Sequence, residues 1–65
     1  MSTLRSQFDA VHDSIINGQR TQAYSQMKEI GMYDLPEMLE YFAEDLGNPE
    51  LAIDAARTYF RLASR

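Results

Sequence analysis

Residues 34–46 place the tightest constraint on the fold of this chain, because their apolar and acidic side chains recur with the period of an α-helix. One set lies on a single helical face: Leu35, Met38, Leu39, Phe42 and Leu46. A second set repeats at the same steps on the other side: Glu37, Glu40, Tyr41 and Glu44. The stretch predicts an amphipathic helix with one face toward a core and one acidic face.

The ends of this helix are marked by residues with known positional preferences. Asp34 and Glu37 have the spacing at which two side chains satisfy free backbone N–H groups at a helix start. Pro36 fits the first turn, where its missing N–H leaves no bond unmade. Gly47 is expected to end the helix with a positive φ, since glycine enters the left-handed conformation without strain. We therefore expect a helix from Asp34 to Leu46.

Three further segments have helical periodicity, and each is bounded by turn or capping residues. We expect helices over residues 3–16, capped by Ser2 or Thr3, over residues 19–30, and over residues 49–63, capped by Asn48. Their stripes predict a set of inward side chains: Leu4, Phe8, Val11, Ile15, Ile16, Ala23, Tyr24, Met27, Ile30, Leu51, Ala52, Ala55, Ala56, Tyr59, Phe60 and Ala63.

The connectors between these segments are short, and no segment alternates with the period of a β-strand. We therefore predict an all-α fold: a compact bundle of four short helices arranged as two helical hairpins, forming one domain over residues 1–65. A chain of this length buries only about 60% of its unfolded surface. Its stability should be a few kcal/mol unless self-association adds to it.

Charge is distributed unevenly along the chain, whose formal net charge is −4. Residues 1–33 are balanced, residues 34–56 hold seven acids and no base, and residues 57–65 hold three arginines. Binding to duplex nucleic acid requires clustered Lys and Arg, and the acidic segment would repel phosphate. We expect no direct nucleic-acid ligand, and a basic protein surface as the better electrostatic match.

Composition also bears on the compartment. The chain has no cysteine, which excludes a disulfide framework and a thiolate zinc site. Its first residues lack the apolar run of a signal peptide, and nowhere does it contain the run of about 18 apolar residues that a membrane span needs. We expect a soluble, cytoplasmic protein that does not contact a membrane.

Few residues suggest catalytic chemistry. His12 is the single histidine, and helical spacing places Asp9 and Asp13 near it, as in a metal or general-base site. We favour a partly exposed histidine beside two solvated acids, because no further ligand or nucleophile is identifiable. Glu40 and Glu44 are one turn apart, but a di-metal bundle also needs Glu-x-x-His motifs, and none occurs. We predict a non-enzyme without metal or cofactor.

The acidic helix face is the candidate partner-binding surface, because exposed tyrosines anchor interfaces and acids attract basic partners. The predicted contact residues are Tyr33, Glu37, Glu40, Tyr41, Glu44 and Asp45. The alternative interpretation is a solvated face on which Tyr41 merely covers a neighbouring helix.

The stretch Ile16-Asn-Gly-Gln-Arg-Thr-Gln-Ala23, between two short amphipathic segments of a small acidic chain, resembles small helical proteins encoded by bacteriophages. The resemblance covers about a quarter of the chain. It implies a bacterial cytoplasmic setting and a role in binding and blocking a host protein. Anti-CRISPR proteins and inhibitors of restriction or transcription have functions of this kind.

Two functional hypotheses follow. The first is an inhibitor that binds a host nucleic-acid-handling protein through the acidic face. The second is a structural or assembly protein that forms a homodimer through residues 49–63. In the second hypothesis, small side chains allow close helix approach, and Arg57 and Arg61 pair with acids of another copy; the small residues are Ala52, Ala55, Ala56 and Ala63.

Overall fold

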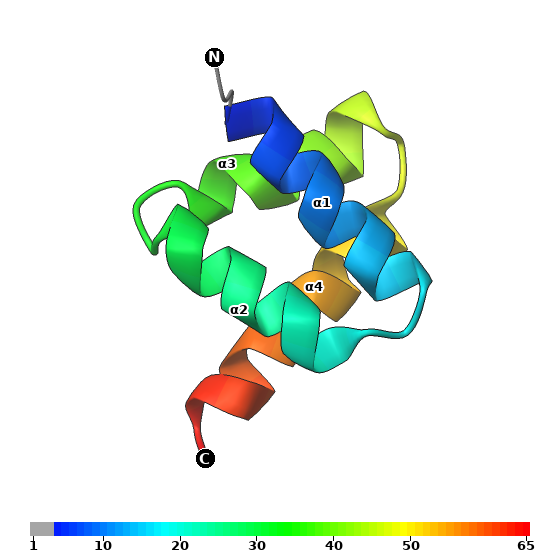
Figure 1. Cartoon of the computed structure of the whole chain (residues 1–65). Helices are drawn as coiled ribbons and strands as arrows, with labels where there is room; N and C mark the ends of the chain where they lie inside the picture. The colour runs from blue at the N-terminus through cyan, green and yellow to red at the C-terminus, as the bar shows by residue number, and fades with distance from the viewer. Residues whose placement is uncertain (1–3) are drawn as a thin grey trace.

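The computed structural model describes residues 4–65, and over that range all its regular structure is helical (Figure 1). The elements in chain order are α1 (Leu4–Ile16), α2 (Arg20–Ile30), α3 (Leu35–Glu40), a π-helical turn η1 (Tyr41–Asp45) and α4 (Pro49–Ala63). The predicted all-α bundle is confirmed. The predicted cap at Ser2 or Thr3 lies outside the described residues.

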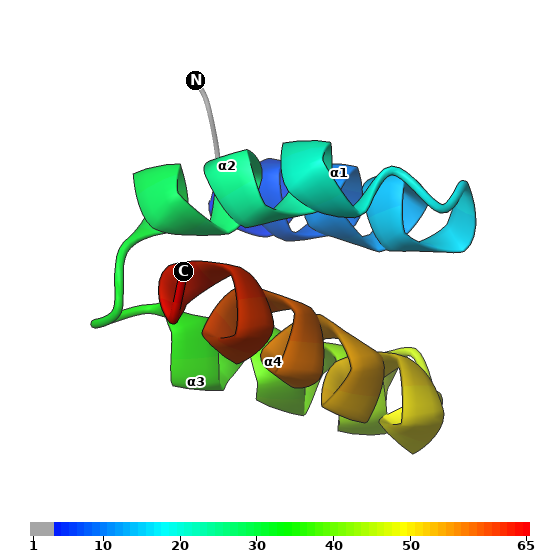
Figure 2. The same ribbon diagram turned by 90° about the horizontal axis from the view of Figure 1, so that it is seen from below.

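The helices form two layers (Figure 2). The first layer contains α1 and α2 side by side, and the second contains α3, η1 and α4. Each layer is one helical hairpin, as predicted, and α2 packs on α4 between the layers. The molecule measures 30 × 26 × 22 Å along its principal axes.

The hydrophobic core lies between the two layers and draws on every helix. Its buried apolar residues are Phe8, Val11, Ile15, Ala23, Met27, Ile30, Leu35, Met38, Phe42, Leu51, Ala52 and Ala55. Phe42, Met27, Met38 and Val11 are the largest side chains that are fully buried. Burying one side chain of this size contributes about 1.5–3 kcal/mol, so these four residues account for much of the packing energy.

The turn signals of the sequence act as predicted at two hairpin corners. Gly18 and Gly47 follow helix ends and have φ values of +75° and +64°. At the start of α4, the side chain of Asn48 accepts a hydrogen bond from the Leu51 N–H at 3.1 Å, and Pro49 is the first helical residue. These local signals determine where the second hairpin turns.

The predicted reciprocal cap at the start of α3 is wrong. The side chain of Asp34 makes no capping hydrogen bond. Its backbone has helix-like torsions (φ −100°, ψ −6°), because the N–H groups of Asp34 and Leu35 both bond to the carbonyl of Gly31. A capping side chain needs an extended backbone to reach the free N–H groups, so Asp34 is in the wrong conformation to cap.

The acidic helix is not α-helical to its end. The N–H of Leu46 bonds to the carbonyl of Tyr41 at 3.0 Å, five residues back, as in a π-helical turn. The wider turn rotates later residues away from the α-helical stripe. Leu46 is consequently 41% exposed rather than in the core, which corrects the sequence-based prediction.

Three other residues predicted to face inward lie at the surface: Ile16, Phe60 and Ala63. Ile16 and Phe60 each follow a residue that already points inward, Ile15 or Tyr59, and successive helical side chains diverge by about 100°. Ala63 lies in the last turn of α4. Phe60 is 62% exposed.

A polar cluster at the N-terminal end of α2 links the two layers. The guanidinium of Arg20 donates to both carboxylate oxygens of Asp54, at 2.7 and 3.1 Å, and to the hydroxyl of Thr58 at 2.8 Å. Thr58 is buried, so this bond satisfies a hydroxyl that packing removes from water. The hydrogen bond and charge of Asp54 raise the pKa of Arg20 above its ordinary value.

Candidate protein-binding site

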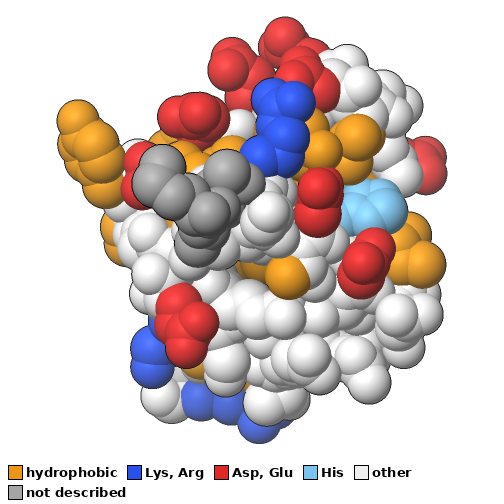
Figure 3. Space-filling view, turned by 45° about the horizontal axis from the view of Figure 1, so that its top comes forward, with side chains coloured by type: hydrophobic (Ala, Val, Ile, Leu, Met, Phe, Trp, Pro, Cys, Tyr) orange, Lys and Arg blue, Asp and Glu red, His pale blue; other side chains and the backbone are white. Residues whose placement is uncertain are grey.

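The N-terminal half of α1 and the outer side of α3 and η1 enclose a shallow polar hollow of about 170 Å³, here called the acidic hollow. Its lining residues are Leu4, Arg5, Phe8, Glu37, Glu40, Tyr41, Glu44 and Asp45. Figure 3 shows acidic side chains gathered around a basic one on this side of the molecule. The hollow therefore gathers four carboxylates around Arg5.

Three of the four carboxylates have no partner among residues 4–65. Glu37, Glu40 and Glu44 are exposed, and none of their side chains makes an ion pair or hydrogen bond with a described residue. Asp45 pairs with Arg5, whose Nη2 lies 3.3 Å from Oδ2. Because exposed pairs of this kind contribute little to stability, the negative charge of the hollow is available to an incoming cation.

Tyr41 forms the aromatic wall of the hollow. Its ring lies against Phe8 with centroids 5.9 Å apart, and its hydroxyl donates to Asp9 Oδ1 at 2.7 Å. This hydrogen bond, together with burial, raises the pKa of Tyr41 above its ordinary value of 10.0. Tyr41 therefore covers α1 and uses its hydroxyl within the chain, while the binding role of the acidic face stays a prediction.

Arg5 occupies the hollow in a way that the sequence did not indicate. Its Cζ atom lies 4.6 Å from the centroid of the Tyr41 ring, while its Nη2 contacts Asp45. A guanidinium is therefore held there by an aromatic face and a carboxylate, an attractive arrangement for a cation. Arg5 and Asp45 are 40 residues apart in sequence, so no local motif connects them.

The six predicted contact residues divide into two groups. Five of them line the acidic hollow: Glu37, Glu40, Tyr41, Glu44 and Asp45. Tyr33 does not; it lies on the connector between α2 and α3 and is 96% exposed. The acids could be grouped from the sequence because they are close together on one helical face. The distance of Tyr33 from the hollow depends on the path of the connector, which the sequence does not give.

The residues considered for metal binding or base catalysis are not gathered into one site. His12 Nδ1 lies 3.3 Å from Asp13 Oδ1, and its ring packs edge-on against Phe42. Asp9 instead accepts the Tyr41 hydroxyl. Among residues 4–65, no three His, Cys, Asp or Glu side chains are placed to hold a metal ion together.

Comparisons with known proteins found no similar chain: no protein-family model, no curated protein and no solved structure matches it. In the described part of the chain, no helix has both the length and the apolar character needed to cross a membrane. The function of the acidic hollow is therefore argued from its own geometry and charge.

Proposed function

We propose that this chain is a small protein-binding module whose acidic hollow receives a Lys or Arg side chain from the basic surface of a partner protein. The observation that carries the proposal is the set of three carboxylates, on Glu37, Glu40 and Glu44, that have no side-chain partner among residues 4–65. These carboxylates bind the charged end of such a side chain.

Arg5 supports this proposal as an internal example of the ligand. Arg5 already uses the Tyr41 ring and Asp45, and Glu40 and Glu44 offer a partner arginine carboxylate acceptors of the same kind. The unbalanced charge of residues 34–56 attracts a basic surface before contact, which mainly increases the association rate. The hollow then determines which side chain is held.

A narrower form of the proposal follows from the resemblance to phage-encoded proteins. The partner is then a host protein that handles nucleic acid in the bacterial cytoplasm, and the module inhibits it in the manner of anti-CRISPR, anti-restriction or transcription inhibitors. Along the helix, Glu37, Glu40 and Glu44 supply one charge per about 5 Å, compared with about 3.4 Å along a DNA strand. We therefore propose that inhibition blocks a basic surface and does not copy a DNA strand.

The test is affinity capture from a bacterial lysate with two charge-matched double variants. Glu40→Lys/Glu44→Lys reverses the hollow, while Asp13→Lys/Glu29→Lys reverses two exposed acids elsewhere on the surface. We expect a partner that the native chain and the Asp13/Glu29 variant both retain, and that the Glu40/Glu44 variant and added salt both release. A partner retained equally by both variants would rule out the acidic hollow as its binding site.

A further inference from the structure

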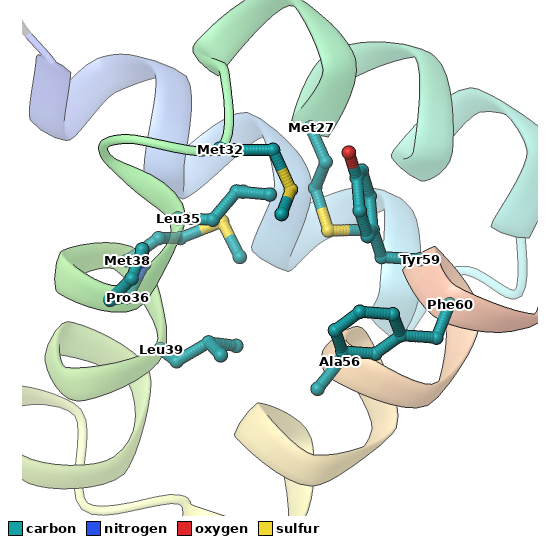
Figure 4. A pocket seen from close by; sticks show the side chains of 9 residues that line it. All are labelled: Met27, Met32, Leu35, Pro36, Met38, Leu39, Ala56, Tyr59 and Phe60. Atoms are coloured by element: carbon teal, nitrogen blue, oxygen red, sulfur yellow. The ribbon is translucent and has the colours of Figure 1, made fainter. Parts of the chain in front are cut away.

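The helices α3 and α4 diverge away from the Gly47 turn (Figure 1), and a second concave surface lies between them (Figure 4). It contains an apolar pocket of about 120 Å³. The lining residues are Met27, Met32, Leu35, Pro36, Met38, Leu39, Ala56, Tyr59 and Phe60. Figure 4 shows Leu39 on one side of this pocket and Phe60 with Ala56 on the other. We call this surface the α3–α4 groove.

The rim of the groove exposes large apolar side chains. Met32 and Phe60 are each 62% exposed, and Ile53 is also exposed on α4. Ile53, Ala56 and Phe60 have the three- and four-residue spacing of a helix–helix contact stripe. This outer stripe is distinct from the inner face of α4, which contributes Leu51 and Ala55 to the core. The helix therefore has a second apolar face on which Ile53 and Phe60 are more than half exposed.

The size of the pocket indicates the kind of occupant. Sites for small organic ligands have volumes of about 300–1,000 Å³, whereas this pocket has about 120 Å³. It suits one apolar side chain delivered by a protein surface. Exposed methionine and aromatic side chains are also the residue types enriched in protein interfaces.

The charged residues that flank the groove on its two helices have opposite sign. Glu40 follows the groove-lining Leu39 on α3, and Arg57 follows the groove-lining Ala56 on α4; both charged side chains are exposed. Arg57 makes no ion pair with a described residue. A surface with one acidic edge and one basic edge is complementary to a copy of itself.

We infer that the α3–α4 groove is covered by a second copy of this chain in a two-fold dimer. The opposite charges that flank the groove favour one direction of the two-fold axis. An axis along the groove lays α3 of one copy over α4 of the other, so that Glu40 meets Arg57. An axis across the groove would instead place acidic edge over acidic edge. Along the favoured axis, the Phe60 ring of each copy covers the other copy's pocket.

A standard interface buries about 800 Å² on each partner, which is roughly a fifth of this chain's 4421 Å² of accessible surface. Small domains also gain stability by association when their own core is limited. Glu40 belongs to the acidic hollow as well, so the dimer is tested first at Phe60, which lies outside the hollow.

Sedimentation velocity tests the dimer, from about 10 to about 500 µM protein, the affinity range of small interfaces. The variant is Phe60→Ser, and its matched control is Ile16→Ser, because the two native side chains are 62% and 59% exposed on different helices. We expect Phe60→Ser to weaken dimerisation at least about tenfold, as truncation of a central interface residue does, and Ile16→Ser to leave it unchanged. Circular dichroism confirms that both variants remain folded.

A charge exchange tests the orientation of the two copies. Arg57→Glu/Arg61→Glu and Glu37→Lys/Glu40→Lys should each weaken self-association, and mixing the two should restore a heterodimer. A native chain that stays monomeric over the whole concentration range, a dimer that Phe60→Ser leaves intact, or a mixture that does not associate would overturn the inference. The Phe60→Ser variant retains the acidic hollow. Capture of a partner from the lysate by this monomeric variant therefore tests the hollow independently of the dimer.

Discussion

Phe42 is fully buried and contacts rings from two directions, His12 on α1 and Tyr41 on η1, each with centroids 5.9 Å away. Phe42→Ala should therefore lower the free energy of unfolding by about 3–5 kcal/mol. Leu39→Ala should have a smaller effect, because Leu39 is only half-buried beside the α3–α4 groove. Urea denaturation at low protein concentration measures the free energy of unfolding of both variants. An equal loss of unfolding free energy in the two variants would show that the wrong side of this helix has been assigned to the core.

The hydrogen bond between Tyr41 and Asp9 predicts a specific response to alkaline pH. Because the bond and burial raise the pKa of Tyr41 above 10.0 in the folded chain, the folded state holds this proton more tightly than the unfolded state. The resulting stabilisation is fully present below the unfolded pKa and is lost as the pH rises through the folded pKa. The melting temperature should therefore fall more steeply above about pH 10 for the native chain than for Tyr41→Phe.

The control for this measurement is Tyr33→Phe, because Tyr33 is 96% exposed on the connector. Its alkaline profile should follow that of the native chain. Identical slopes for the native chain and Tyr41→Phe would contradict the role assigned to the Tyr41–Asp9 bond.

At the scale of the elements, the corner between η1 and α4 depends on the backbone of Gly47. Its φ is +64°, and a Cβ atom added there would meet no other atom within 4 Å. The penalty for a side chain therefore comes from the left-handed conformation and not from crowding. Gly47→Ala should destabilise the chain by about 1–2 kcal/mol in thermal or urea unfolding, and Gly47→Asn by less. Equal stability of Gly47→Ala and the native chain would mean that the corner adopts another conformation.

The elements also show what can be read from sequence and what cannot. Asn48, Pro49 and Gly47 act through neighbours a few residues away, so their positions alone located the corner. Periodicity identified the apolar stripes, but it does not tell which edge of a stripe a neighbouring helix covers. Leu46 and Phe60 were therefore placed in the core, although the π-helical turn and the divergence of α3 and α4 leave both exposed.

The candidate site also contains some features that the sequence predicts and others that it does not. The acids of the hollow share one helical face, and their proximity followed from spacing alone. The contributions of Arg5 and Asp9 could not be predicted, because each contacts a residue at least 32 positions away, across the packing of α1 on the second layer. The same packing turned Tyr41 from a free surface residue into part of an interhelical contact.

At the scale of the whole molecule, the two proposed surfaces lie mainly on the second layer and share the helix of residues 35–45. The acidic hollow occupies its side toward α1, and the α3–α4 groove occupies its side toward α4. Glu37, Glu40, Glu44 and Asp45 all line the hollow and not the groove, although Glu40 adjoins the groove-lining Leu39. A dimer formed through the groove therefore leaves Glu44, Asp45 and Tyr41 facing a partner.

The central claim, that the acidic hollow binds basic side chains, is tested most directly by titrating the chain with a short arginine-rich peptide and recording backbone amide spectra. We predict chemical-shift changes concentrated in residues 4–8 and 37–45, weakened by salt and abolished by Glu40→Lys/Glu44→Lys. The Asp13→Lys/Glu29→Lys control should respond like the native chain. Shift changes of equal size at Asp13, Glu29 and the hollow, or changes that persist in the Glu40/Glu44 variant, would contradict the claim.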